Sequence, residues 1–303
     1  MTPTQLSKGL WGVLATPFHG PDLEVDLESL RREVDLYLSV PADGFVVLGV
    51  FGEGVALDSA EQAEVVSEVA KAAPGTPLVV GVSARTTVVA VEQARTAAGA
   101  AGSSLAGVMV QANTTDPGVL AKHLAAVHEA TGAGVVLQDY PEASGVRITA
   151  EQVLQVLAES PFVVAVKSEA PPTSAAIGRL TSQTDVPVFG GLGGVGLLDE
   201  LAAGAAGAMT GFSHPEGLRA ALDAWAAGGY PAARAAFAPW LPLVNYEAQP
   251  GVGLAIRKEI LRQRGIFADS AVRPPARTAP SEILRLLPDH LAAVRDLVAS
   301  ATH

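Results

Sequence analysis

The feature of the sequence that most constrains the fold is an eightfold alternation of short apolar segments with amphipathic ones in residues 1–215. The apolar segments carry almost no charge, as expected for parallel strands that are covered on both faces. Strands are expected over Trp11–Thr16, Gly44–Leu48, Leu78–Val82, Ala106–Gln111, Gly134–Tyr140, Val163–Lys167, Val186–Gly190 and Ala208–Gly211. Eight strand–helix units are the number that closes a barrel. The alternation therefore predicts an α/β fold, a (β/α)8 TIM barrel, with an open doubly wound sheet as the alternative.

The amphipathic segments predict helices between the strands and a helical region after them. Helices are expected over Asp26–Leu38, Ser59–Ala73, Thr86–Ala101, Pro117–Ala130, Thr149–Glu159 and Ser174–Thr181. Strand signals stop after Gly211, and further helices are expected over Leu218–Ala227, Pro231–Tyr246, Val252–Arg264 and Pro280–Ala299, with a loop at Phe267–Thr278. We therefore expect a barrel over residues 1–215 and a C-terminal helical extension over residues 216–303, which packs on the barrel or mediates oligomerisation.

Composition excludes several classes of function. The net charge of −11 disfavours nucleic acid and anionic membrane surfaces as partners, because both select basic proteins. The absence of cysteine excludes disulfides, thiol nucleophiles and Cys-ligated zinc, and the six scattered His show no metal-ligand spacing. No signal peptide or membrane-spanning segment is recognised. We therefore expect a cytoplasmic protein without a metal site.

Lys167 is the strongest candidate for a catalytic residue. It ends an otherwise apolar strand, where a TIM barrel places its functional residues. Burial of an unpaired ammonium is costly and favours the neutral amine, which is a nucleophile toward carbonyl groups. The alternative is a lysine that reaches solvent or pairs with a carboxylate such as Glu169.

Two further strand ends carry residues of interest. The loop Gly49-Val50-Phe51-Gly52-Glu53-Gly54 follows the second strand, and its glycines let the backbone N–H groups approach a ligand carboxylate. The alternative is an ordinary turn in which Glu53 caps a helix. On the fifth strand, Gln138 and Tyr140 point to one face and Asp139 to the other. If that face is the barrel interior, Gln138 and Tyr140 lie near Lys167.

The seventh and eighth strands end in small and polar residues. Gly190 and Gly191 follow the seventh strand, and the eighth is followed by the run from Thr210 to His214. Loops at these positions hold anionic groups in many barrels. No Lys or Arg is nearby in sequence, so a carboxylate or neutral group held by the backbone is expected rather than a phosphate. His214 could titrate near neutrality or be structural.

Taken in order, these pieces resemble the dihydrodipicolinate synthase/N-acetylneuraminate lyase family from about Gly12 to about Gly265. The matching features are Thr16-Pro17-Phe18, the G-x-x-G-E loop, the proline turn at Pro141 with Gly145 beyond it, Lys167, and the helix that contains Arg257-Lys258. The resemblance implies a (β/α)8 barrel, commonly a tetramer, whose lysine forms a Schiff base with pyruvate or a related 2-oxo acid. It also implies that the G-x-x-G-E loop holds the substrate carboxylate.

The sequence departs from the family pattern beside the lysine. Val50-Phe51 replaces the usual hydroxyl pair, and Gln138 stands where the family usually has its catalytic tyrosine. Ala143 occupies the place of the arginine that binds the aldehyde substrate in dihydrodipicolinate synthases proper. Lysine biosynthesis is therefore disfavoured. The proton transfers fall to Tyr140, Glu169, His214 or a bound water, and Phe51 favours a drier pocket and a substrate with a less polar tail.

The function predicted from the sequence is a Schiff-base-forming lyase of the class I aldolase type. Lys167, Tyr140 and Gln138 are its expected catalytic residues, and the substrate is expected to contact residues 49–53, Gly190, Gly191 and Thr210. No separate cofactor is expected, because the imine on Lys167 serves as the electron sink. The alternatives are a 2-oxo acid dehydratase that uses the same imine, a catalytically degenerate paralogue that binds a small acid, and a phosphate-binding isomerase. A homo-oligomer, tetramer or dimer, is expected.

Overall fold

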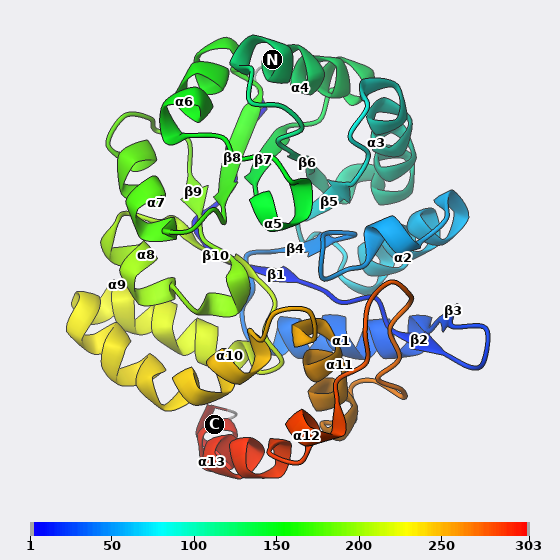
Figure 1. Ribbon diagram of the computed structural model, residues 1–303, viewed down its shortest axis with the longest axis vertical. Helices are drawn as coiled ribbons and strands as arrows, with labels where there is room; N and C mark the ends of the chain where they lie inside the picture. The colour runs from blue at the N-terminus through cyan, green and yellow to red at the C-terminus, as the bar shows by residue number, and fades with distance from the viewer. Residues whose placement is uncertain (1–2, 302–303) are drawn as a thin grey trace.

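Eight parallel strands form the centre of the molecule. The structure is a computed structural model that describes residues 3–301. The strands are β1 (Gly9–Val13), β4 (Gly44–Val47), β5 (Leu78–Val82), β6 (Leu105–Gln111), β7 (Val135–Asp139), β8 (Val163–Ser168), β9 (Val188–Phe189) and β10 (Gly207–Thr210). Their order is β10-β1-β4-β5-β6-β7-β8-β9, and a bridge between Gly190 and Ala208 brings the two ends of the sheet together. The predicted (β/α)8 barrel is thereby confirmed, and the open sheet is wrong (Figure 1).

Helices surround the strands as the sequence predicts, and each begins or ends within about a residue of its expected position. They are α1 (Leu27–Ser39), α2 (Ser59–Ala72), α3 (Thr87–Ala101), α4 (Pro117–Thr131), α6 (Ala150–Glu159) and α7 (Thr173–Thr181). Asp58 and Thr149 form capping boxes that fix the starts of α2 and α6.

Several short elements were not predicted from the sequence. They are the hairpin of β2 (Phe18–His19) and β3 (Glu24–Val25), α5 (Pro141–Ser144), α8 (Leu197–Ala202), and the 3-10 turns η1 (Gly54–Ala56), η2 (Gly102–Ser104), η3 (Leu192–Gly194) and η4 (Ala238–Trp240). Elements of two to six residues are too short to show a hydrophobic period, which is the signal on which the sequence argument depends. Strand β1 also lies earlier than expected, because Gly9 pairs with Gly207 and the ladder ends at Val13.

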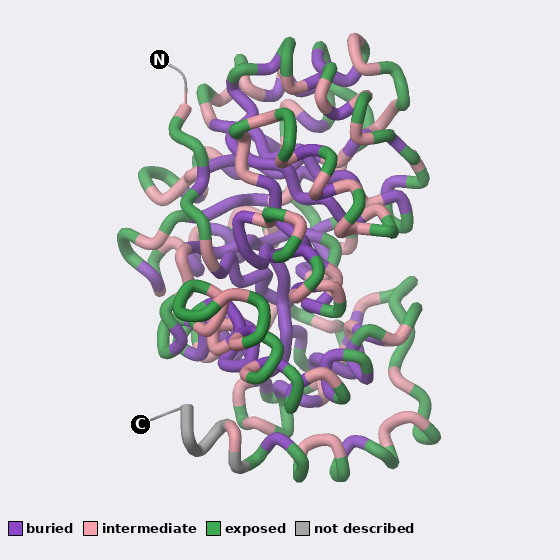
Figure 2. Tube along the Cα trace, turned by 90° about the vertical axis from the view of Figure 1, so that its left-hand side faces the viewer, coloured by how far each residue is buried: buried purple, intermediate pink, exposed green. Residues whose placement is uncertain are grey.

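Apolar side chains fill most of the barrel interior. The inward-facing cluster consists of Leu6, Trp11, Val13, Val46, Val79, Met109, Val136, Val164, Ala165, Phe189, Ala206 and Met209. The strands are buried along their length, whereas the outer helices are exposed on one side (Figure 2). Among the residues that the structure describes, polar interior side chains appear at the carboxyl ends of the strands, where Gln138, Lys167 and Thr210 are all buried. The fold therefore confines polar chemistry to one end of the barrel.

The predicted C-terminal helical extension is also confirmed. It consists of α9 (Pro215–Phe237), α10 (Leu241–Glu247), α11 (Gly253–Gln263), α12 (Ser281–Leu284) and α13 (Leu287–Ala301). A kink at Gly228 and Gly229 divides α9, which is why the sequence suggested two separate helices there. In Figure 1, α10 and α11 lie beside the barrel mouth and α13 lies farthest from it. Within residues 3–301, no helix combines the length and apolarity needed to cross a membrane.

Candidate active site

Lys167 lies inside the barrel, near the carboxyl end of β8. It pairs in register with Gln138 on β7, and only 6% of its surface is exposed. It faces a small space that we call the inner cavity, lined by Val13, Val50, Phe51, Gln138, Tyr140, Lys167, Glu169, Leu192, Gly193, Thr210 and Gly211. The free volume there is about 20 Å³, which is room for about one water molecule. The amine is thus inside the barrel mouth, as its position at a strand end predicts.

Glu169 is the buried carboxylate that organises the inner cavity. Its Oε2 atom lies 3.2 Å from Lys167 Nζ and accepts a hydrogen bond of 2.7 Å from Gln138 Nε2. Its Oε1 atom accepts a hydrogen bond of 3.2 Å from the backbone N–H of Leu192. A Cβ atom at Gly191 would lie 2.1 Å from this Oε1, so only glycine leaves room for the carboxylate. Lys167 therefore has a carboxylate beside it that is held in place by two other groups.

The fifth-strand residues lie as the strand alternation predicts. Gln138 and Tyr140 both line the inner cavity. Asp139 is buried on the opposite face of the strand, where its Oδ1 atom has no hydrogen-bond partner within residues 3–301. Burial raises the pKa of Tyr140 to about 12, and the charges of Glu169 and Glu142 act in the same direction. Tyr140 therefore keeps its proton at neutral pH, and its hydroxyl can donate a hydrogen bond.

The glycine loop after β4 presents backbone N–H groups next to the cavity. Thr16 Oγ1 donates a hydrogen bond of 2.6 Å to the carbonyl of Gly52, and this bond fixes the loop against β1. A Cβ atom at Gly54 would lie 2.3 Å from the carbonyl oxygen of Leu48, which explains glycine there. In the described part of the chain, the N–H groups of Val50 and Phe51 have no hydrogen-bond acceptor. These two donors are free to bind an anion.

Glu53 lies behind the loop and anchors it to the C-terminal helices. Its carboxylate pairs with Lys258 on α11, whose side chain is fully buried, and accepts a hydrogen bond of 3.0 Å from the backbone N–H of Arg273. Burial lowers the pKa of Lys258, and the charge of Glu53 opposes that shift. Neighbouring Arg257 pairs with Glu247 at 3.2 Å and lies 4.1 Å above the ring of Phe51. Contact of Glu53 with the substrate stays a prediction; in the structure its carboxylate lines the space beside the cavity and is bound by Lys258 and Arg273.

Of the residues in and after β9 and β10 that were expected to contact the substrate, Thr210 lines the inner cavity, whereas Gly190 and Gly191 do not. Thr210 lines the inner cavity and its Oγ1 accepts a hydrogen bond of 2.8 Å from Gly193 N–H. Gly190 and Gly191 lie behind the cavity wall, against the carboxylates of Glu200 and Glu169. Their neighbours Leu192 and Gly193 face the cavity instead.

Of the two alternatives that the sequence left open for His214, the structure favours the structural one. It is buried, contacts Phe212 and Trp240, and its Nδ1 lies 2.9 Å from Ser213 Oγ. Burial lowers the pKa of His214 to about 3, with a contribution from Arg264, so the ring is neutral at neutral pH. It lines neither the inner cavity nor the spaces beside it. The structural alternative is therefore the correct one.

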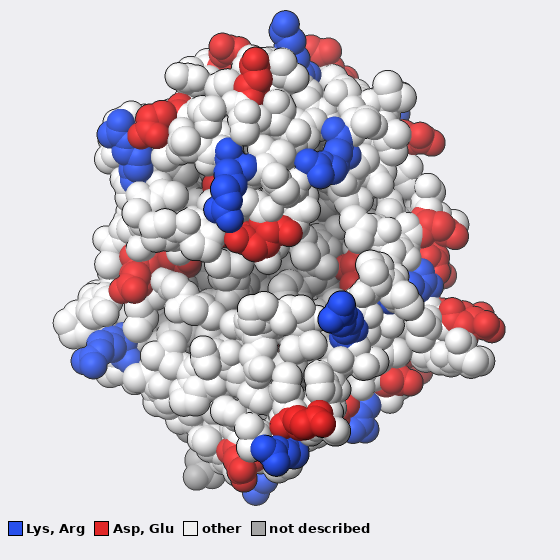
Figure 3. Space-filling model, in the orientation of Figure 1, with Lys and Arg blue, Asp and Glu red and all other residues white. Residues whose placement is uncertain are grey.

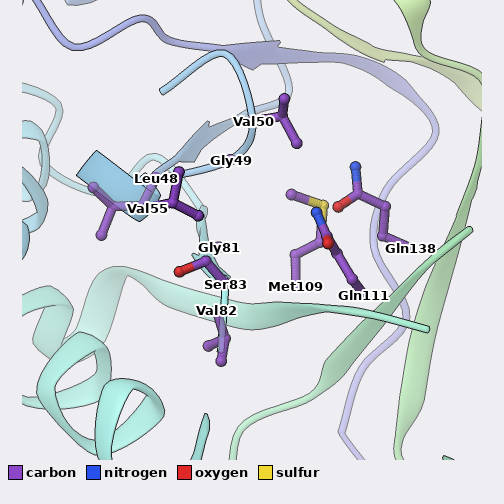
Figure 4. Close-up of a pocket in the computed structure, with 10 residues that line it drawn as sticks. All are labelled: Leu48, Gly49, Val50, Val55, Gly81, Val82, Ser83, Met109, Gln111 and Gln138. Carbon is purple, nitrogen blue, oxygen red and sulfur yellow. The ribbon is translucent and has the colours of Figure 1, made fainter. Parts of the chain in front are cut away.

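Two further spaces adjoin the inner cavity. The larger, which we call the vestibule, measures about 600 Å³ and is lined by residues 50–51, 53, 55–56, 140, 192–193, 195, 245, 247–251, 253–254, 257, 273 and 275–276. It is the hollow at the centre of the face in Figure 3, bordered largely by uncharged residues. The smaller lies between the glycine loop on one side and Met109, Gln111 and Gln138 on the other (Figure 4). Val50 lines all three spaces.

Comparison with known proteins agrees with this geometry. The profile of the dihydrodipicolinate synthetase family matches residues 6–293. The chain belongs to the dihydrodipicolinate synthetase family. It is 29% identical to the L-2-keto-3-deoxyarabonate dehydratase of Azospirillum brasilense, over 90% of this chain and 89% of that protein. It is 32% identical to 4-hydroxy-tetrahydrodipicolinate synthase 1 of Streptomyces coelicolor, over 95% and 93%.

A solved structure shows the same architecture. The dihydrodipicolinate synthase of Rhodopseudomonas palustris superimposes with a TM-score of 0.88 at 32% identity, covering 97% of this chain and 99% of that one.

The sequence thus led to the right family and fold. The sequence did not reveal that Arg257 and Lys258 are buried beside the glycine loop, because charged residues on an amphipathic helix usually face solvent. Glu169 had a usable signal, since it lies two residues after Lys167 and side chains alternate along a strand.

Replacement of Lys258 by Met tests whether the buried ion pair holds the glycine loop. Loss of one partner leaves Glu53 buried and uncompensated, so the free energy of unfolding should fall by about 3–5 kcal/mol. Urea denaturation measures the change. The double variant Lys258→Met/Glu53→Gln is the control and should recover part of the loss, because it leaves no unpaired charge. A loss below about 1 kcal/mol in the single variant would show that the pair is not important.

The raised pKa of Asp139 predicts a pH dependence of stability. Burial, with help from the charges of Glu169 and Glu142, raises this pKa from 3.8 to about 6. A carboxyl with a raised pKa contributes stability that is present below its unfolded pKa and is lost as pH rises through its folded pKa. The stability of Asp139→Asn relative to wild type should therefore increase between about pH 4 and pH 7, as followed by urea denaturation. Exposed Asp35→Asn is the control, and a stability difference between Asp139→Asn and wild type that does not change with pH would refute the assignment.

Proposed function

We propose that the chain is a Schiff-base-forming lyase that acts on pyruvate or another 2-oxo acid, with Lys167 as the nucleophile. The observation that carries the proposal is the position of its amine, buried at the carboxyl end of the barrel and 3.2 Å from the carboxylate of Glu169. The relatives are named as a dehydratase and as synthases, which supports an aldolase or dehydratase of this family. The imine needs no separate cofactor, because it is itself the electron sink.

Substrate binding would begin at the glycine loop. The free N–H groups of Val50 and Phe51 bind the carboxylate of the 2-oxo acid, in the absence of the hydroxyl groups that are usual at these positions. The inner cavity is smaller than a 2-oxo acid, so a lining side chain must shift when the substrate binds. Val50 is suited to this shift because it is 40% exposed and lines all three spaces.

The chemistry would then proceed through Lys167 and Glu169. Glu169 removes a proton from the lysine, the free amine attacks C2 of the 2-oxo acid, and water leaves to form a protonated imine. Cleavage of the C3–C4 bond in a 4-hydroxy-2-oxo acid sends that electron pair into the imine, while a base takes the proton of the 4-hydroxyl group. The resulting enamine is protonated at C3 and hydrolysed.

Glu169 is positioned to perform the proton transfers that the family pattern assigns to tyrosine. Gln138 occupies the tyrosine position but has no proton to exchange, and its amide instead orients Glu169 Oε2 at 2.7 Å. Tyr140 lines the same cavity, and no residue within the described range of 3–301 accepts a hydrogen bond from its hydroxyl. It is therefore available as a proton donor to the substrate.

Dehydration is the second candidate outcome, favoured by the similarity to the Azospirillum dehydratase. The same imine acidifies the protons on C3, and loss of one proton with a hydroxyl from C4 releases water instead of breaking the C3–C4 bond. Product analysis distinguishes the two reactions: cleavage yields pyruvate and an aldehyde, whereas dehydration keeps the carbon chain intact.

The proposed enzyme is a cytoplasmic homo-oligomer, dimer or tetramer. The support is that large apolar side chains remain exposed on neighbouring helices, with Val88 on α3 79% exposed and Val119 on α4 54% exposed. Such exposure is typical of surfaces that bind another subunit.

Borohydride trapping tests the proposed function. Incubation with pyruvate and sodium borohydride should attach a reduced pyruvyl group to the peptide that contains Lys167, detected by mass spectrometry. Lys167→Arg should abolish labelling, because a guanidinium does not form the imine, whereas the control Lys122→Arg should retain it. If the wild-type protein gives no adduct with any of several 2-oxo acids, a degenerate paralogue that binds acids without turnover becomes the better account.

Substitution of Glu169 by Gln tests its role in proton transfer. The amide keeps the size of the side chain but cannot accept the proton of Lys167. The kcat for cleavage of a 4-hydroxy-2-oxo acid should therefore fall by about 10²–10⁴-fold. The adduct with borohydride should still form, more slowly. Glu142→Gln, which replaces a half-exposed carboxylate outside the cavity, is the control. Retention of the wild-type kcat in Glu169→Gln would assign the proton transfers to Tyr140 or water.

A further inference from the structure

The vestibule is continuous with the site of the proposed reaction. Five residues line both the vestibule and the inner cavity, namely Val50, Phe51, Tyr140, Leu192 and Gly193. The vestibule has about 600 Å³ of free volume, in the range of small-molecule sites, whereas the inner cavity has about 20 Å³. Any substrate larger than pyruvate must therefore place its distal part in the vestibule.

The walls of the vestibule are mainly apolar. Carbon-rich side chains come from four parts of the chain, with Val55 in η1, Val195 after η3, Leu254 on α11 and Pro275 among them. Val55 and Val195 are 78% and 50% exposed, which is unusual for large aliphatic side chains. Exposed apolar residues gathered around a concave space are typical of a ligand site.

The charged groups of the vestibule are already paired within the protein. Glu53 is paired with Lys258, and Glu247 with Arg257. The two terminal guanidinium nitrogens of Arg273 contact Glu61 at 2.5 and 2.7 Å, and Gln249 Nε2 donates to the carbonyl of Tyr246. Of the polar side chains that line the vestibule, those of Tyr140 and Asn245 have no hydrogen bond within the described residues, and Nη1 of Arg257 is buried there without a partner. A polyhydroxylated chain would thus lose its bonds to water and find few replacements.

We propose that the vestibule binds an apolar tail, so that the substrate is a 4-hydroxy-2-oxo acid with an alkyl or aryl group on C4. This inference rests on the proposed function and specifies its substrate class. The carboxylate lies at the glycine loop, C2 at Lys167, and the tail among Val195, Leu254 and Val55. Cleavage of the C3–C4 bond converts R–CHOH–CH2–CO–COO⁻ into R–CHO and pyruvate, with no oxidant or reductant required.

The experiment compares cleavage of three substrates that differ only in the tail. The probes are 4-hydroxy-2-oxo-4-phenylbutanoate, a 2-oxo-3-deoxy sugar acid of similar size, and a 4-hydroxy-2-oxo dicarboxylate. The wild-type kcat/KM should be at least about tenfold higher for the phenyl compound than for either of the others. Borohydride labelling of Lys167 by pyruvate is measured in parallel, because it reports the imine without any tail.

Variants of the vestibule wall show whether it is the origin of the preference. Val195→Asn/Leu254→Asn places two amides where the tail would lie, and the ratio of kcat/KM for the phenyl compound to that for the sugar acid should fall about tenfold. Leu38→Asn on α1, 44% exposed and away from all three spaces, is the matched control and should keep the wild-type ratio.

Each result decides between the two proposals. Labelling of Lys167 without a preference for the phenyl compound overturns the apolar subsite and leaves the Schiff-base lyase standing. A preference for the dicarboxylate also overturns it and indicates that Arg257 or Arg273 binds the tail. Absence of labelling overturns the proposed function and the subsite together.

Discussion

The contact between Glu169 and Lys167 is the interaction on which the rest of the site depends. A single carboxylate binds the amine of β8, the amide of Gln138 on β7 and the backbone N–H of Leu192 after β9. It thereby joins three neighbouring segments at the mouth of the barrel. Burying an isolated charge at the barrel mouth costs too much free energy. Lys167 and Glu169 can both be buried there because each lies beside the other. In the proposed reaction, Glu169 would accept the proton that Lys167 must lose before its amine attacks a carbonyl.

The C-terminal helices complete the site rather than merely covering the barrel. Lys258 and Arg257 on α11 contact Glu53, Glu247 and the ring of Phe51, so the glycine loop is held from outside the barrel as well as by Thr16 within it. The extension also forms much of the vestibule wall. The barrel carries Lys167, and the C-terminal helices contribute to the shape and polarity of the vestibule beside it.

The sequence predicted the fold well because the fold depends on patterns that repeat. The strand and helix periods are local, and the strand from Leu78 to Val82 has exactly the bounds that they predict. Neighbouring strand ends also placed Gln138 beside Lys167, since parallel strands finish at the same edge. Contacts between distant segments could not be predicted in this way. From its helix alone, Lys258 is expected at the surface, and only the fold shows that it pairs with Glu53. From its loop alone, Gly191 is expected to contact a ligand, and only the fold shows that the carboxylate of Glu169 fills the space beside it.

The measurement that tests the central claim most directly is a crystal structure of the protein soaked with pyruvate and reduced with cyanoborohydride. Continuous electron density from Lys167 Nζ to C2, with the carboxylate on the N–H groups of Val50 and Phe51 and Glu169 beside the new bond, is the predicted result. Pyruvate bound intact, with its carboxylate paired to an unmodified Lys167 ammonium, would contradict the account.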